Sequence, residues 1–129
     1  MPRTSFTTPK IAAPVGPYSS AVRANGFVFL SGQVGQDPRT GRLVEGGVAA
    51  QAEQIFANLN AVLEAAGKSF ADVVRVGVYL TDAADYPALN EIYARHFDKP
   101  YPARTVIMVA ALPLGARAEI DLVVSLVNG

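Results

Sequence analysis

Residues 48–80, VAAQAEQIFANLNAVLEAAGKSFADVVRVGVYL, contain a whole helix followed by a whole strand, and the rest of the chain must pack around this unit. Apolar side chains recur at three- and four-residue intervals from Val48 to Ala66, which is the spacing of one helical face. Gly67 follows where a helix C-terminal cap is usual. From residue 73 the period changes to two, with Val74, Val76, Val78 and Leu80 on one side of a strand and Arg75, Gly77 and Tyr79 on the other.

The segments before this unit predict a β-hairpin. Ser20–Ala24 and Phe27–Ser31 flank Asn25-Gly26, a pair that supplies the two positive φ angles of a two-residue hairpin turn. Residues 37–41 place Pro and Gly where turns use them. Residues 1–13 show no such pattern, and we expect them to form a loose N-terminal arm.

The segments after the unit predict a second helix and two more strands. The helix follows Asp85, accepts Pro87 in its first turn and carries an apolar stripe that runs on to His96 and Phe97. The strands lie near residues 104–110 and 117–127. The order β-hairpin, α, β, α, β, β predicts an α/β (α+β) fold with one mixed sheet and both helices on one face.

Length and composition favour a single domain over residues 1–129. Half of the residues are apolar and 17% are charged, which is typical of a globular protein. The formal net charge is zero and Lys and Arg do not cluster, which argues against nucleic-acid or membrane partners. The sequence has no cysteine, which excludes disulfides and thiolate chemistry and favours a reducing, cytoplasmic location. No apolar run approaches the ~20 residues of a membrane helix.

Two helices are expected to leave one face of the sheet uncovered. A helix is about 10 Å across and strands lie about 4.8 Å apart, so two helices cover about four strands on one face only. The opposite face carries Gly77, Tyr79, Val123 and Val127, which is an apolar surface to leave in water. We therefore expect a homo-oligomer that buries this second face.

Arg104 and Glu119 are the candidate functional pair. They stand on two short predicted strands that are joined by a Leu-Pro-Leu-Gly turn. A half-buried Arg needs an anion, which is either Glu119 across adjacent strands or a bound ligand. Its planar fork matches a carboxylate through two hydrogen bonds. The residues therefore leave two interpretations open: a structural ion pair, or a pocket for a small carboxylic acid in which Glu119 handles protons or water.

The motifs that accompany common cofactors do not occur. With one His and no Cys, the chain lacks the usual zinc ligands. It has no nucleophile elbow, no P-loop and no G-x-G-x-x-G sequence. These observations favour chemistry on a reactive small molecule without a metal or cofactor.

Several separated motifs follow one another along nearly the whole chain, from about residue 11 to the C-terminus. They are Ala13-Pro14-Val15-Gly16-Pro17-Tyr18-Ser19, Phe29-Leu30-Ser31-Gly32-Gln33, the Gln51…Asn58 helix that ends in Glu64-Ala65-Ala66-Gly67, Asn90-Glu91-Ile92-Tyr93, Pro102-Ala103-Arg104, Leu112-Pro113 and Glu119-Ile120. In this order and register the chain resembles the RidA/YjgF family of reactive-intermediate deaminases.

The resemblance implies a homotrimer of chorismate-mutase-like subunits with three sites between subunits. It implies hydrolysis of enamines and imines such as 2-aminoacrylate to a 2-keto acid and ammonia, with no cofactor or metal. Arg104 would grip the substrate carboxylate and Glu119 would position or activate water. The pocket lining, to which neighbouring subunits would contribute different members, would consist of Tyr18, Ser31, Gly32 and Asn90.

Thr105 and Val106 depart from the family pattern, because many members have a small residue and then a Cys after the Arg. This puts substrate identity in question more than reaction type. Structural roles also remain open for Ser31-Gly32 as a bulge, for Asn90 as a solvent-facing helix residue and for His96 as a core residue. Gly77 in mid-strand predicts the close approach of another backbone, which suits a subunit interface.

Two other functions stay open at this point. One is a non-enzymatic module that binds or senses a 2-keto acid through Arg104. The other is a role in RNA cleavage or in holding unfolded proteins, with both of which the family is associated. The zero net charge disfavours a role on RNA.

Overall fold

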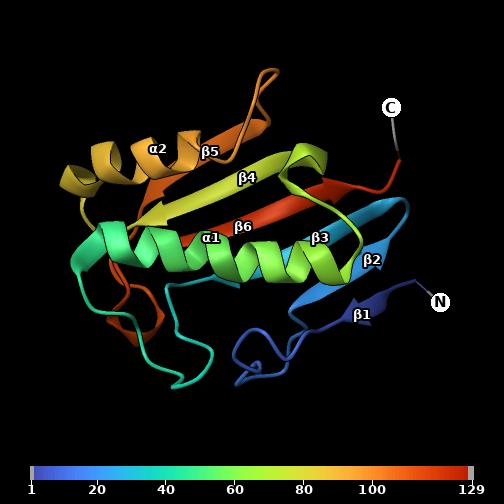
Figure 1. The fold of residues 1–129 in the computed structure, drawn as a ribbon, viewed down its shortest axis with the longest axis horizontal. Coiled ribbons are helices and arrows are strands. Elements are labelled where there is room, and N and C mark those ends of the chain that lie inside the picture. Colours follow the sequence, from blue (N-terminus) through green and yellow to red (C-terminus); the bar gives the residue numbers. More distant parts are fainter. Residues whose placement is uncertain (1, 128–129) are drawn as a thin grey trace.

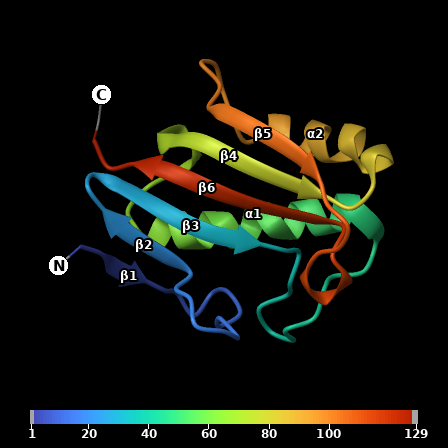
Figure 2. The same cartoon turned by 180° about the vertical axis from the view of Figure 1, so that it is seen from behind.

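The computed structural model describes residues 2–127, which form one sheet with helices packed on it (Figures 1 and 2). The strands are β1 (Thr4–Phe6), β2 (Ala21–Ala24), β3 (Phe27–Gln33), β4 (Val73–Leu80), β5 (Ala103–Met108) and β6 (Ala118–Ser125). The α-helices are α1 (Gly47–Ala65) and α2 (Tyr86–Ala94), and short 3-10 turns occupy Phe70–Asp72, Ala83–Asp85 and Pro113–Gly115.

The strands lie in the order β1-β2-β3-β6-β4-β5. β4 and β5 are parallel, and the remaining neighbours are antiparallel. Figure 1 shows α1 and α2 on the same face, and Figure 2 shows the other face uncovered. The mixed α+β sheet with both helices on one face is therefore confirmed. In the described part of the chain, neither helix combines the length and apolar character that crossing a membrane requires.

The core lies between the helices and alternate residues of the central strands. Ala118, Ile120, Leu122 and Val124 of β6 are buried, whereas the residues between them are only half-buried. This alternation follows from the period of two in a strand, which sends successive side chains to opposite faces. Glu119 therefore belongs to the open face of the sheet, which the helices do not cover.

The start of β4 differs from the sequence prediction. Val73 is buried and Val74 is 42% exposed, although the alternating pattern places Val74 on the inner side. The pairing of β4 with β6 shifts register between Val73 and Arg75, and this bulge exchanges the two valines. From Val76 onward the predicted alternation is confirmed.

The prediction of a loose N-terminal arm over residues 1–13 is wrong for Thr4–Phe6. These residues form β1, which pairs with β2 at the edge of the sheet. Phe6 packs against the core, and the guanidinium of Arg23 lies 5.5 Å from its ring centroid. The aromatic ring and the cation above it hold this end of the chain, where local spacing shows no strand pattern.

His96 follows α2, which ends at Ala94, and it belongs to an aromatic cluster. Its ring stacks on Phe56 at 4.1 Å between centroids, and Phe70 lies 5.2 Å away. Burial lowers the pKa of His96, which favours the neutral ring. The structural alternative for His96 is confirmed.

An ion pair between the buried Asp85 and the exposed Arg117 joins the start of α2 to the start of β6. Asp85 is 6% exposed and accepts two hydrogen bonds from Arg117, from Nε at 2.9 Å and from Nη2 at 2.7 Å. The backbone N–H of Arg117 donates to Oε1 of Gln51 on α1 at 2.9 Å. The bidentate pair and the amide fix the end of the loop before β6, close to Glu119. Sequence spacing alone does not indicate this group.

Candidate functional site

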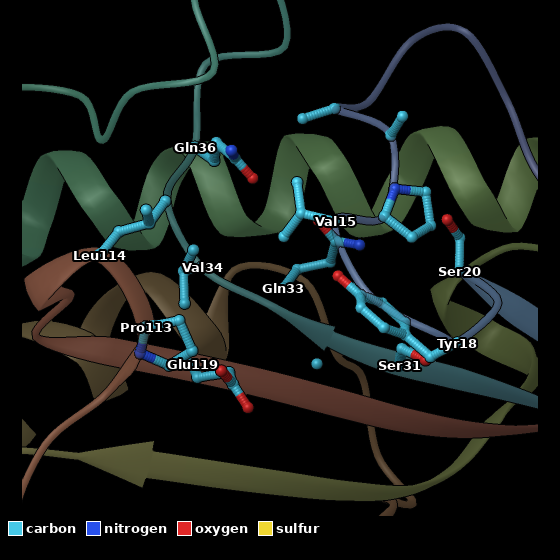
Figure 3. A pocket seen from close by; sticks show the side chains of 14 residues that line it. Val15, Tyr18, Ser20, Ser31, Gln33, Val34, Gln36, Pro113, Leu114 and Glu119 are labelled. Atoms are coloured by element: carbon cyan, nitrogen blue, oxygen red, sulfur yellow. The ribbon is translucent and has the colours of Figure 1, made fainter.

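Glu119 lies in a cavity of about 390 Å³ at one end of the sheet, where β3, β6 and two loops meet (Figure 3). The residues that line it come from residues 12–20, from β3 and the residues after it, from the Pro113 turn and from β6. They are Ala12, Ala13, Pro14, Val15, Tyr18, Ser20, Ser31, Gly32, Gln33, Val34, Gln36, Pro113, Leu114 and Glu119. Four of the predicted site residues, Tyr18, Ser31, Gly32 and Glu119, therefore share one cavity.

The Glu119 carboxylate is held in surroundings that favour its neutral form. Burial raises the pKa of Glu119 above its ordinary value, and the nearby Asp121 carboxylate raises it further. Among residues 2–127, the carboxylate makes no hydrogen bond. A carboxyl group with a raised pKa and no hydrogen-bond partner among residues 2–127 is suited to taking up a proton and giving it back.

Gly32 provides the space that the Glu119 carboxylate occupies. A Cβ at Gly32 would collide with the end of the Glu119 side chain. The register of β3 with β6 shifts between Leu30 and Gln33, so Ser31-Gly32 forms a bulge. The structural role of these two residues is confirmed, and it serves the site because the bulge sets Gly32 against the carboxylate.

Gly32→Ala should inactivate the protein without unfolding it. The added methyl meets the far end of a flexible side chain rather than backbone, so the fold adapts while Glu119 is displaced. We expect kcat for the imine hydrolysis that the family resemblance implies to fall about 10²-fold, which is typical for a misplaced catalytic group. Steady-state kinetics beside a thermal melt measure both effects; wild-type kcat in a folded Gly32→Ala variant would contradict this role.

The walls of this cavity are tied to the body of the protein. The Ser31 hydroxyl donates to the backbone oxygen of Ser19 at 2.6 Å, which links β3 to the segment after Tyr18. The buried amide of Asn58 on α1 donates to the backbone oxygens of Val34 and Gln36. Tyr18 itself is 53% exposed, so its ring faces the cavity from the rim rather than from the core.

Arg104 lies elsewhere, between β5 and α2. Its Nη1 donates to Oδ1 of Asn90 at 2.8 Å, and its Nη2 donates to the hydroxyl of Tyr86 at 2.8 Å. Its Cζ lies 4.6 Å from the ring centroid of Tyr93. Asn90 is therefore not a solvent-facing helix residue, and it lies beside Arg104 as a shared site requires.

The guanidinium retains donors for a ligand. Arg carries five N–H groups, and these two bonds leave three of them, including Nε–H, without a partner among residues 2–127. A second cavity of about 290 Å³ opens beside it and is lined by Asn90, Tyr93, Ala94, Tyr101, Pro102 and Arg104. A fixed, half-buried cation beside a cavity is suited to binding a small organic anion.

Arg104 and Glu119 do not meet within one subunit. β4 lies between β5 and β6, so their strands are not adjacent. Arg104 pairs in register with Val76, which faces the helices, whereas Glu119 pairs with Tyr79 on the open face. Partners in register share a face, so the two side chains project from opposite sides of the sheet. The alternative of an Arg104–Glu119 ion pair across adjacent strands is wrong.

The departures from the family pattern fall on different sides of β5. The hydroxyl of Thr105 accepts a hydrogen bond from Nη2 of Arg75 at 3.1 Å on the open face. Val106 packs against the core. Thr105 can therefore contact a molecule or subunit that packs on the open face, whereas Val106 contributes to the core.

Gly77, also on the open face, lies beside side chains of its own subunit. A Cβ at this position would meet the Asp121 carboxylate and the Tyr79 hydroxyl, which are themselves joined by a hydrogen bond of 2.9 Å. Within one subunit these side chains, and not another backbone, are what Gly77 accommodates. The approach of a backbone from a neighbouring subunit stays a prediction.

Sequence reasoning missed Tyr86 and gave Tyr93 no role at the site. Tyr86, Asn90 and Tyr93 recur at helical spacing on α2 and all contact Arg104. The signal that could identify them is this i, i+4, i+7 stripe of polar and aromatic groups on a helix beside an edge strand.

Comparison with known proteins identifies the family. A family model described as "Endoribonuclease L-PSP" matches residues 8–126. A human protein named 2-iminobutanoate/2-iminopropanoate deaminase is 45% identical over 121 residues, which cover 94% of this chain and 88% of the relative. A protein of the same name from Dermatophagoides farinae is 42% identical over 123 residues, covering 95% of this chain and 96% of the relative.

A solved structure agrees with these relatives. The crystal structure of RidA from an Antarctic Psychrobacter superposes with a TM-score of 0.90 at 47% identity, covering 95% of this chain and 98% of that chain. The chain belongs to the RidA/YjgF family, and the resemblance of its motifs is confirmed.

Proposed function

We propose that the protein is a cofactor-independent deaminase that hydrolyses small enamines and imines of the 2-aminoacrylate type to a 2-keto acid and ammonia. The observation that carries this proposal is the pair of complementary groups: a fixed guanidinium with donors that residues 2–127 do not use, and a carboxyl group with a raised pKa. The deaminase names of relatives at 42% and 45% identity support it. In this role the protein removes a reactive intermediate.

The reaction needs only binding and proton transfer. 2-Aminoacrylate gains a proton at its terminal carbon and loses one from its nitrogen, which converts it to the imine. Water then adds to the imine carbon, forms a C–O bond and converts the C=N bond to a single bond. Loss of ammonia from this tetrahedral intermediate forms the C=O of the keto acid. Glu119 takes a proton from the attacking water and returns it to the departing nitrogen, while Arg104 holds the substrate carboxylate.

The proposed site is completed between subunits of a homotrimer. One subunit contributes Arg104 and Asn90, and its neighbour contributes Tyr18, Ser31, Gly32 and Glu119. Two observations support this assembly. The two groups lie on opposite faces within one subunit. The open face also exposes large apolar side chains, Phe27 at 40%, Phe29 at 43% and Ile107 at 46% of their surface, which neighbouring copies would bury.

Two alternative functions are weaker. A module that only binds a 2-keto acid requires the Arg104 site. It gives no reason for the raised pKa of Glu119, whose carboxyl group lies in the other cavity. The family description names an endoribonuclease, yet the formal net charge of this chain is zero, whereas RNA backbones are bound by excess positive charge.

The direct test of the proposed function is an assay with 2-aminoacrylate generated in situ by a pyridoxal-phosphate enzyme. The purified protein should accelerate release of ammonia and pyruvate over buffer, and should do so without added metal and in the presence of a chelator. Equal rates with and without the protein, for 2-aminoacrylate and for the imine of 2-aminobutanoate, would reject the proposal.

A further inference from the structure

We infer that the hydroxyl of Tyr86 is a positioning group for the anion-binding guanidinium of Arg104, an inference that rests on the proposed function. The hydroxyl oxygen accepts a hydrogen bond from Nη2 at 2.8 Å, and Asn90 accepts one from Nη1 at the same distance. Both acceptors stand on α2, one helical turn apart, so they reach the guanidinium from a single rigid element.

Two acceptors fix an orientation that one acceptor leaves free. A guanidinium with one hydrogen bond still rotates about that bond, whereas bonds at both terminal nitrogens define its plane. The ring of Tyr93, 4.6 Å from Cζ, supports the planar group but does not select a rotation within its plane. The Tyr86 oxygen therefore decides which N–H groups remain directed at the ligand.

Packing alone does not account for the hydroxyl of Tyr86. The ring packs against the core, and a phenylalanine ring would pack in the same way. Among residues 2–127, Arg104 is the hydrogen-bond partner of this hydroxyl. The oxygen is thus explained by its contact with Arg104, and its effect should appear in binding of the substrate carboxylate.

Tyr86→Phe keeps the ring and removes the acceptor. Loss of one hydrogen bond to a charged group should raise KM for the imine and Kd for a 2-keto acid together, by about 5- to 30-fold. Because Tyr86 does not touch the reacting atoms, kcat should stay within about two-fold, which is the pattern for loss of uniform binding. Kinetics give KM and kcat, and calorimetry with 2-ketobutyrate gives Kd.

Ser69→Ala is the control for the loss of a hydroxyl. It removes an exposed hydroxyl that accepts a hydrogen bond from the backbone N–H of Ala71 at 3.3 Å, and Ser69 lines neither the Glu119 cavity nor the Arg104 cavity. Its Kd for 2-ketobutyrate should equal that of the wild type. A weaker Kd in Tyr86→Phe with an unchanged Kd in Ser69→Ala supports the inference.

Three results would overturn it: wild-type Kd and KM in Tyr86→Phe, a fall in kcat with KM unchanged, or a melting temperature lowered by more than a few degrees. The last would assign the hydroxyl to stability. Failure of the proposed function is distinguishable, because calorimetry needs no turnover: a wild-type protein without deaminase activity would still show whether Tyr86 supports binding of the keto acid.

Discussion

Arg104→Lys should remove nearly all deaminase activity while leaving the protein folded. Lysine retains the positive charge, but it cannot donate to Asn90 and Tyr86 while also presenting a planar fork to a carboxylate. Loss of two charge-assisted hydrogen bonds to the substrate should lower kcat/KM by about 10²- to 10⁴-fold. The loss should be as large for 2-aminoacrylate as for a bulkier imine, because both carry the same carboxylate.

The measurement compares kcat/KM of Arg104→Lys with that of Arg95→Lys. Arg95 lies on the surface, where it pairs with Glu53 and Glu91 through a side chain that is 58% exposed. The control variant should retain wild-type kcat/KM, since exposed ion pairs contribute little. Wild-type activity in Arg104→Lys would show that charge alone suffices and that the fork is not required.

Glu119→Gln should have opposite effects on activity and stability. Glutamine cannot take a proton from water, so kcat should fall about 10²- to 10⁴-fold. Because burial and Asp121 raise the pKa of Glu119, the folded state holds its proton more tightly than the unfolded state does. The ionised form therefore costs stability at pH 7, and glutamine removes that cost. The variant should melt at a higher temperature than the wild type at pH 7.

The raised pKa of Glu119 determines how the stability difference between Glu119→Gln and the wild type changes with pH. The stability that the protonated form of Glu119 contributes is fully present below its ordinary pKa of 4.5 and is lost as the pH rises through the raised value. The difference in melting temperature between Glu119→Gln and wild type should therefore be largest at neutral pH and vanish below 4.5. In the wild type, kcat should fall as the pH drops through the same raised pKa.

Melts and kinetics over one pH series test both effects. Glu64→Gln, at an exposed position of α1, is the control and should change neither kcat nor the pH dependence of melting. A Glu119→Gln variant that is less stable than the wild type at pH 7 would mean that the surroundings stabilise the ionised carboxylate, which contradicts a raised pKa.

Much of the fold is predictable because local patterns agree with the final packing. The Val48–Ala66 periodicity gives α1, and alternation gives β4 and its buried side from Val76 onward. The order of the strands in the sheet, by contrast, cannot be predicted from local patterns. The chain connects β5 to β6 directly, which suggests neighbours, yet β4 stands between them. Hydrogen bonding between distant segments sets that order, and no local spacing encodes it. The same holds for β1, since its three residues are ordered by pairing with β2.

In the candidate site, too, the sequence predicts some features and tertiary packing sets the others. The residue types of Arg104 and Glu119 indicate anion binding and proton transfer, and their surroundings suit both capacities. Their separation onto opposite faces depends on the register of β5 and β6 with β4. The role of Gly32 depends on a bulge, and that of Tyr86 on the docking of α2 beside β5. These are tertiary features, so a sequence pattern supplies the chemical groups but not their arrangement.

In the proposed trimer, Arg104 of one subunit acts with Glu119 of another. Arg104→Lys and Glu119→Gln subunits, each inactive alone, should be unfolded, mixed in equal amounts and refolded. If sites form between subunits, about a quarter of them pair an intact Arg104 with an intact Glu119, and about a quarter of wild-type deaminase activity should return. Refolded mixtures that form mixed oligomers but stay as inactive as either variant alone would contradict the claim.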